Sequence, residues 1–240
     1  MKKIDKNLNY LNRFRSLKEH EKQMIKLIKK YNNKKKINVL DLGCADGIFL
    51  QNLSKFLKIE NLTGVDLDGR LIKVAKSRTY QCKKNYFYKL NITNYLSGKN
   101  LLKNKNLFDV VILSGVLAFF IKRYKILNNI NKILKKGGRI YCFDRCIEKN
   151  IDIQYKVKLS GNKKWDKTYY VPSLRTHKNT IHNFFSNIII KRFKIPFDIK
   201  NQNTVYSSYT IRLKNNNRLI RTHYNFINEL YFLTAKKMVK

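Results

Sequence analysis

Short apolar segments alternate with longer amphipathic segments between residues 37 and 145, and no other feature of the sequence constrains the fold as strongly. The short segments have the composition of buried strands, and most are followed by a stretch with the apolar spacing of a helix. Repeated strand–helix units of this length build a parallel sheet with right-handed crossovers and helices on both faces. We therefore expect an α/β domain, whose first strands cover residues 37–42, 62–66, 86–90, 108–113 and 139–144.

The expected helices have recognisable faces and ends. After the first strand, the inward face should consist of Ile48, Phe49, Leu53, Phe56 and Leu57. Asp68 is placed to cap the next helix, and a helix at 124–134 stops at basic residues and two glycines. Before the first strand, a capping box at 16–19 should start a helix that packs on the domain through Leu17, Met24, Leu27, Ile28 and Tyr31.

After residue 145 the pattern becomes antiparallel. Residues 151–159 alternate strictly between apolar and polar side chains, which predicts a half-buried strand that returns at 165–171. The elements expected after this hairpin are a helix at 177–185, a strand at 188–195, a hairpin at 209–217 and a strand at 229–235. We expect one domain in three parts: an N-terminal helical segment (1–36), a ligand-binding core (37–145) and substrate-side hairpins that complete the sheet (146–240).

The chain carries 52 Lys and Arg against 15 Asp and Glu, a formal net charge of +37. Basic side chains neutralise phosphates, so such a charge suits an anionic partner. The basic residues are spread along the whole length, however, and few Ala, Gly and Pro beside many Lys, Asn and Ile indicate compositional drift. We expect a solvated basic surface, with a small and anionic substrate favoured over nucleic acid as the partner.

Cysteine spacing and hydropathy set two further expectations. The closest cysteines, Cys142 and Cys146, have no partner at metal-ligand spacing, so neither a disulfide framework nor a metal site is expected. The first residues lack the apolar stretch of a signal peptide, and the longest apolar run, 110–121, is too short to span a bilayer. We expect a cytoplasmic protein without a membrane span.

Small and acidic residues gather where the first two strands end. The first strand runs into the turn GCADG at 43–47, where glycines and a small alanine let the backbone approach a ligand closely. The second strand ends in Asp66. Ligands of parallel sheets bind beyond the carboxyl ends of the strands, and a carboxylate there can accept hydrogen bonds from two ribose hydroxyls. The sequence therefore predicts a site for a nucleoside-containing cofactor.

The glycine spacing indicates which nucleoside. Dinucleotide sites use Gly-x-Gly-x-x-Gly, so that a helix N-terminus can meet the pyrophosphate. Here Gly43, Ala45 and Gly47 alternate with single residues, and Asp41 and Asp46 bring negative charge beside the turn. A pyrophosphate would be repelled, whereas a sulfonium or ammonium group would not. The pattern argues against a nicotinamide dehydrogenase.

The segment INVLDLGCADGIFL at 37–50 resembles the first motif of the class I S-adenosylmethionine-dependent methyltransferases. The motifs that follow in that family are similar, in order and spacing, to LTGVDLDGRLIKVAK (62–76), FDVVILSGVL (108–117) and ILKKGGRIY (133–141). The resemblance covers residues 37–145 and implies a Rossmann-like, seven-stranded, mostly parallel sheet with S-adenosylmethionine as the cofactor. The second half more weakly resembles bacterial methyltransferases associated with surface-sugar biosynthesis.

The resemblance also implies roles for single residues. The methionine moiety would be lined by Asp41, Gly43, Ala45 and Gly47. The ribose would be held by Asp66, and the adenine would lie beside Leu67, Asn91 and Ile92. The pocket would be closed by Ser114 and Gly115. Relatives often have an acid at the position of Asn91 that accepts from the adenine amino group, and the Asn91 oxygen can accept the same bond less strongly.

The sequence assigns no catalytic base. Where many relatives have an acid or a histidine after the fourth strand, this chain has Ala118, Phe119 and Phe120. The catalytic candidates that remain are Asp144, His177, His182 and His223. The candidates for substrate binding are Arg145, Arg175 and Arg221, which suit an anionic acceptor, and Trp165, which suits a stacked ring.

We expect a methyltransferase that acts on a small molecule, with a saccharide or sugar phosphate as the suggested acceptor. The first alternative is an RNA methyltransferase that uses the basic surface, although the loop 114–117 lacks the motifs of base-modifying enzymes. The second alternative is a non-catalytic methyltransferase-like scaffold, since Ala45 and Asn91 depart from the family pattern.

Overall fold

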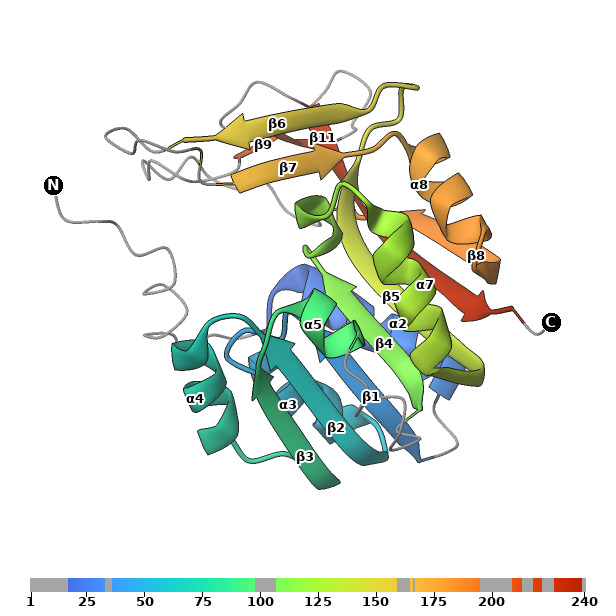
Figure 1. Cartoon of the computed structure of the whole chain (residues 1–240). Helices are drawn as coiled ribbons and strands as arrows, with labels where there is room; N and C mark the ends of the chain where they lie inside the picture. The colour runs from blue at the N-terminus through green and yellow to red at the C-terminus, as the bar shows by residue number, and fades with distance from the viewer. Residues whose placement is uncertain are drawn as a thin grey trace, which may run out of the picture.

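A central sheet covered by helices on both faces forms the body of the protein in the computed structural model (Figure 1). The structure describes residues 17–32, 36–97, 107–158, 165, 167–194, 209–212, 218–221 and 227–238. The main strands are β1 (Ile37–Leu42), β2 (Ile59–Asp66), β3 (Cys82–Lys89), β4 (Phe108–Ser114), β5 (Leu134–Cys146), β8 (Phe185–Arg192) and β11 (Ile227–Lys237). The helices are α2 (Glu19–Asn32), α3 (Ile48–Phe56), α4 (Gly69–Ser77), α5 (Ile92–Ser97), the 3-10 helix η1 (Leu117–Phe119), α7 (Arg123–Ile133) and α8 (Leu174–His182).

The strand order confirms the expected Rossmann-like architecture. Seven strands lie in the order β3-β2-β1-β4-β5-β11-β8. The pairs from β3 to β5 are parallel, and β11 runs antiparallel to both β5 and β8. The two hairpins predicted in the second half are also present: β6 (Ile153–Val157) with β7 (Lys167–Val171), and β9 (Tyr209–Arg212) with β10 (Arg218–Arg221). The second hairpin joins the main sheet through β11.

Alternate residues of β1 face two separate apolar cores. Val39 packs in the core that α2, α3 and α4 cover, and Leu40 packs in the core of α5, α7 and α8. The period-2 alternation of a strand therefore places helices on both faces of the sheet. The hydrophobic spacing of each helix supplies the complementary surface.

The N-terminal helix α2 is a buttress on the sheet. Its Met24 and Ile28 are buried in the first core, and Asn32 Nδ2 donates to the Tyr141 hydroxyl at 2.9 Å. Near its start, the ring of His20 stacks on Phe143 with centroids 4.4 Å apart. The helix begins at Glu19, and Ser16 of the expected capping box lies outside the described residues.

Some predicted boundaries were wrong for local reasons. Helix α8 starts three residues earlier than expected because the Ser173 hydroxyl caps it by accepting the Thr176 N–H at 3.0 Å. Helix α7 ends at Ile133, one residue before the predicted end, and residues 135–138 form an irregularity inside β5, which already pairs with β4 at Leu134. Phe56 was expected to face inward, but its side chain is 51% exposed. It is the last residue of α3, at the edge of the packed surface.

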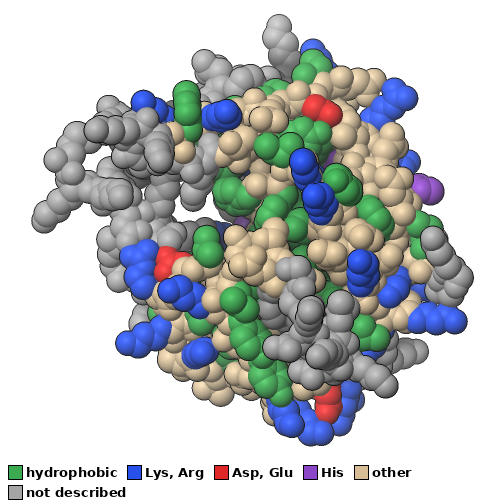
Figure 2. All heavy atoms as spheres, in the orientation of Figure 1, with side chains coloured by type: hydrophobic (Ala, Val, Ile, Leu, Met, Phe, Trp, Pro, Cys, Tyr) green, Lys and Arg blue, Asp and Glu red, His purple; other side chains and the backbone are tan. Residues whose placement is uncertain are grey.

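The remaining composition-based expectations concern surface and ligands. Lys and Arg side chains are scattered over the face shown in Figure 2 rather than gathered in one patch. All four cysteines are free thiols. Within the part of the chain that the structure describes, no helix is long and apolar enough to cross a membrane, and no group of three or more His, Cys, Asp or Glu could hold a metal ion.

Candidate active site

A cleft of about 1080 Å³ opens beyond the carboxyl ends of β1, β2, β3 and β4. This is the edge where open α/β sheets bind ligands. The volume is at the upper end of ordinary ligand pockets, which leaves room for a cofactor and a second molecule. The described lining residues are Gly43, Ala45, Asp66, Leu67, Asp68, Gly69, Arg70, Leu71, Lys89, Leu90, Asn91, Ile92, Ser114, Gly115, Val116, Phe119 and Phe120.

The turn after β1 forms one wall of the cleft. The backbone takes left-handed φ angles at Gly43 (91°), Ala45 (48°) and Gly47 (74°). The N–H of Gly43 donates to the Val65 carbonyl at 2.8 Å, which anchors the turn to β2. A Cβ on Gly43 would lie 2.5 Å from the Val116 side chain, so only glycine fits between this turn and the loop that follows β4.

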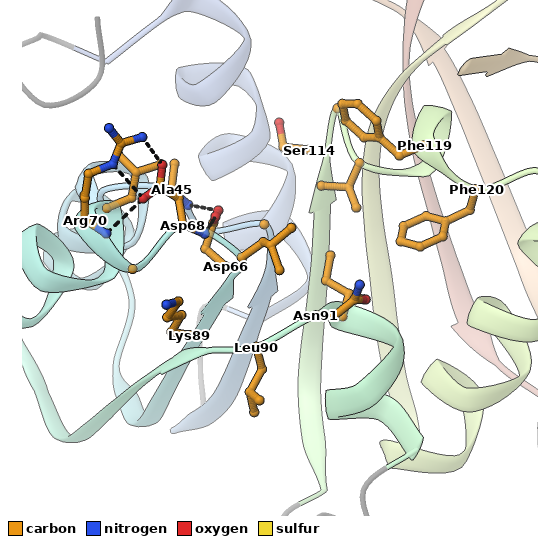
Figure 3. A pocket seen from close by; sticks show the side chains of 17 residues that line it. Ala45, Asp66, Asp68, Arg70, Lys89, Leu90, Asn91, Ser114, Phe119 and Phe120 are labelled. Atoms are coloured by element: carbon orange, nitrogen blue, oxygen red, sulfur yellow. Dashed lines mark hydrogen bonds and ion pairs between the residues drawn. The ribbon is translucent and has the colours of Figure 1, made fainter. Parts of the chain in front are cut away.

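Asp66 joins this turn to the segment that follows β2 (Figure 3). Its Oδ2 accepts the Ala45 N–H at 2.9 Å, and its Oδ1 accepts the Asp68 N–H at 2.9 Å. A carboxylate oxygen has two lone pairs, so each oxygen retains one for a ligand hydroxyl. The side chain is half-buried and lines the cleft, as a partner for a ribose must.

The next part of the wall is apolar and suits a flat base. Leu67 is 68% exposed, and Leu90 and Ile92 line the cleft with it. Asn91 differs from its expected role, because its Oδ1 already accepts both the N–H (2.9 Å) and the hydroxyl (2.7 Å) of Thr93 at the start of α5. Asn91 can therefore offer a ligand its amide N–H groups rather than its oxygen.

Two predicted cofactor residues lie behind the cleft instead of lining it. Gly47 is buried at the start of α3, against the Tyr80 hydroxyl. Asp41 is buried on the α2 side of β1, and no described group donates a hydrogen bond to its Oδ1. Burial, together with the charges of Asp66 and Glu21, raises the pKa of Asp41 to about 8.

The far wall of the cleft follows β4. Ser114 and Gly115 lie at its base, and the Gly115 N–H donates to the Phe143 carbonyl at 2.7 Å. Phe119 and Phe120 complete this wall, on the other side of the cleft from Asp66 (Figure 3). Eight of the ten predicted cofactor residues thus meet around one cleft.

Comparison with known proteins identifies the family in which this arrangement occurs. Residues 33–223 match the family model of the methyltransferase domain. The chain belongs to the methyltransferase domain family. A tRNA U34 carboxymethyltransferase from Campylobacter fetus is 28% identical over 153 residues, which is 63% of this chain and 51% of that protein. The chain thus spans about half the length of this curated relative.

Solved structures share the fold. A methyltransferase from Archaeoglobus fulgidus superposes with a TM-score of 0.59 at 17% identity, over 97% of this chain and 100% of that one. The N-methyltransferase NodS from Bradyrhizobium japonicum, solved with S-adenosylhomocysteine, gives 0.52 at 12% identity, over 97% of each chain. The resemblance to class I methyltransferases and the predicted fold class are confirmed.

Two of the catalytic candidates are joined by a residue that the sequence analysis did not single out. Arg123, at the start of α7, contacts His177 Nδ1 at 3.1 Å and faces Asp144 Oδ2 at 3.7 Å. All three side chains are buried. Burial and the guanidinium lower the pKa of His177 to about 3, so this histidine is neutral at neutral pH and accepts from Arg123.

The same network holds the β6–β7 hairpin. Arg123 Nη2 donates to the Tyr170 carbonyl at 2.8 Å, and the guanidinium lies 5.1 Å from the Tyr170 ring centroid. Burial raises the pKa of Asp144, and Arg123 opposes part of that rise. Neither Asp144 nor His177 lines the cleft, so the geometry makes them positioning residues rather than candidates for the base.

The other candidates are not gathered at the cleft. His182 and Arg175 are exposed on α8, Arg145 is half-buried on β5, and Trp165 is 61% exposed. None of these four lines the cleft. The last two candidates cannot be placed at or away from the cleft: His223 lies outside the described residues, and the side chain of Arg221 on β10 is not described.

The sequence analysis missed two cations at the cleft. Arg70 pairs with Asp68 at 2.8 Å at the rim, and Lys89 lies against Gly69. Their positions in the sequence could have indicated this, since Arg70 comes just after β2 and Lys89 ends β3. Residues that follow parallel strands converge on the edge of the sheet where ligands bind.

Proposed function

We propose that this chain transfers a methyl group from S-adenosylmethionine to a small molecule. The observation that carries the proposal is the position of Asp66, which lines the cleft while one of its oxygens accepts from the turn after β1 and the other from the segment after β2. The left-handed turn, a carboxylate with lone pairs to spare and an apolar wall fit a sugar, a base and a thioether chain. The cofactor residues we assign are Gly43, Ala45, Asp66, Leu67, Asn91, Ile92, Ser114 and Gly115.

The chain contributes orientation and exclusion of water rather than covalent chemistry. The sulfonium supplies an electrophilic methyl group with a good leaving group. With the cofactor bound, the turn, Asp66 and the apolar wall would hold the nucleoside, and Val116, Phe119 and Phe120 would face the acceptor. Such positioning converts an encounter between two molecules into a step within one complex.

The proposed acceptor is a small molecule, and the sequence further suggests a saccharide or sugar phosphate. The net charge of +37 would draw an anionic acceptor toward the cleft. RNA is the second candidate, because the same charge suits it and one relative is named for a tRNA. RNA binding would weaken steeply as salt is raised, whereas a small acceptor with one or two charges would show a much shallower salt dependence.

The test is calorimetric titration of the full chain with S-adenosylmethionine, S-adenosylhomocysteine and NAD. We expect both sulfur compounds to bind and NAD to give no heat of binding. Binding of neither sulfur compound by folded protein would refute the proposal and support the scaffold alternative. Tighter binding of NAD would refute the nucleoside assignment.

A further inference from the structure

The two walls of the cleft differ in chemistry. Each described charged side chain in the lining belongs to the wall that follows β2 and β3: Asp66, Asp68, Arg70 and Lys89. On the wall that follows β4, the described residues are Ser114, Gly115, Val116, Phe119 and Phe120. The cofactor proposed above occupies the charged side and reaches Ser114 and Gly115, so the acceptor would meet the apolar and aromatic remainder of the β4 wall, Val116, Phe119 and Phe120.

The aromatic surface continues beyond the cleft onto the β6–β7 hairpin. Phe119, which is 46% exposed, lies 5.1 Å from the ring of Tyr169. Tyr155, directly opposite Tyr169 in the hairpin, stacks on it with centroids 5.1 Å apart and planes 15° from parallel. Hydrophobic side chains gather between the hairpin and the sheet on the face shown in Figure 2. We call Phe119, Tyr169 and Tyr155 the aromatic ladder.

The ladder is held rigidly. Arg123 binds the Tyr170 carbonyl, and its own side chain is only 3% exposed. Asp152 adds a second attachment, since its Oδ1 accepts the Ser173 N–H at 2.6 Å and its Oδ2 accepts the Tyr170 hydroxyl at 3.0 Å. A pre-organised aromatic surface loses little entropy when a flat ring stacks on it.

We infer that the acceptor is an aromatic ring that carries a hydroxyl group, and that the aromatic ladder recognises its face. A sugar would bring many hydroxyls against a surface whose described side-chain hydroxyls are only those of Ser114, Tyr155 and Tyr169, and unpaired hydroxyls are costly to bury. A phenolic ring brings one hydroxyl and a flat apolar face. This inference rests on the proposed function.

The chemistry of the wall agrees with such an acceptor. No described residue of the β4 wall is an acid, a histidine or a lysine, so this wall suits an acceptor that can give up its proton to water. The hydroxyl of a phenol has a pKa of about 10, whereas a hydroxyl without an aromatic ring, such as that of water, has a pKa of about 15.7. The phenolate oxygen then forms the bond to the methyl carbon, and the electron pair of the broken S–C bond stays on sulfur. The net charge of +37 favours the phenolate.

The test measures binding of 4-hydroxybenzoate to the full chain saturated with S-adenosylhomocysteine. The probes for comparison are cyclohexanecarboxylate, which has the same charge without an aromatic ring, and glucose 6-phosphate. We expect 4-hydroxybenzoate to bind more tightly than both. Its affinity should fall about 2- to 10-fold in Phe119→Leu and in Tyr169→Leu, and stay unchanged in Tyr86→Leu, an exposed tyrosine of β3 outside the ladder.

Equal affinity for the aromatic and the alicyclic acid, preference for glucose 6-phosphate, or equal losses in all variants would overturn the inference. S-adenosylhomocysteine affinity, measured in the same variants, separates the two claims. If that affinity is normal and the aromatic probe fails, the acceptor class is wrong and the methyltransferase proposal stands. If S-adenosylhomocysteine does not bind, the proposed function fails, and the probe affinities still decide whether the ladder binds aromatic rings.

Discussion

The carboxylate of Asp66 accepts the backbone N–H of Ala45 at 2.9 Å, so the last residue of β2 holds the turn that follows β1. The bond therefore links the carboxyl ends of two neighbouring parallel strands, β1 and β2. It places a negative charge beside a left-handed backbone at the point where the cleft begins. If Asp66 also holds a ribose, as proposed, the same side chain contacts both the turn and the ligand.

Replacing Asp66 by Ala should abolish cofactor binding and leave the fold intact. Two hydrogen bonds from ribose hydroxyls to a carboxylate are lost, which corresponds to at least about 100-fold in affinity. The measurement is titration with S-adenosylhomocysteine, with circular dichroism to check the fold. Glu60→Ala, an acid at the other end of β2 that pairs with Lys83 on the surface, is the matched control. Unchanged affinity in Asp66→Ala would refute the ribose assignment.

Ala45→Gly should stabilise the protein. An L-residue in the left-handed region destabilises the folded state by about 1–2 kcal/mol, a cost that glycine does not have. Glycine also makes the unfolded chain more flexible, which offsets about 0.4–1 kcal/mol of this gain in stability. A net gain of about 0.5–1 kcal/mol is expected in urea unfolding. The control is Ala75→Gly inside helix α4, which should instead destabilise by about 1 kcal/mol. Equal losses in the two variants would show that Ala45 is not strained.

The buried Asp41 should make stability fall as pH rises. Its pKa is about 8 in the folded protein and 3.8 in the unfolded chain, so between these values the folded state binds one more proton. Unfolding therefore becomes easier with rising pH across this window, by up to about 1.4 kcal/mol per unit. Asp41→Asn should gain stability over the wild type from pH 4 to pH 8. A pH-independent difference between the two proteins would contradict the shift.

His177 should act in the opposite direction at acid pH. Its pKa is lowered from 6.5 to about 3, so the unfolded chain binds the extra proton between these values and stability is lost as pH falls. His177→Asn keeps an acceptor for Arg123 and removes the titration. Thermal unfolding of the variant and the wild type should differ by a constant amount above pH 7, and the variant should lose less stability below pH 6. Parallel curves down to pH 4 would refute the neutral assignment.

Removing the guanidinium of Arg123 should destabilise the protein strongly. Arg123→Met leaves Asp144 buried without a cation, which costs about 3–5 kcal/mol. Adding Asp144→Asn should recover part of this loss, because the uncompensated charge disappears. Arg175→Met, on the exposed face of α8, is the control and should change stability by less than about 0.5 kcal/mol. No recovery in the double variant would show that the ion pair is not the source of the effect.

Local sequence patterns predicted correctly those elements that depend on the conformation of neighbouring backbone residues. The strand-turn-helix around 37–50, the Asp68 cap of α4 and both hairpins depend on residues close in the chain, and all are present in the structure. The Ser173 cap of α8 shows the limit, because a single hydroxyl moved the boundary by three residues.

Tertiary structure decided which side chains meet. Asp41 and Asp66 both sit near the carboxyl ends of parallel strands, yet Asp66 lines the cleft and Asp41 is buried, because β1 presents Asp41, like Val39, to the face that α2 and α3 cover. Arg123 brings together Asp144 and His177 from separate elements, and Tyr169 reaches Phe119 from a distant hairpin. The amino-acid sequence determined the strand and helix periods and the left-handed turn, since these follow from local geometry. Only packing between segments far apart in the chain set the partners, the burial and the pKa values of the site.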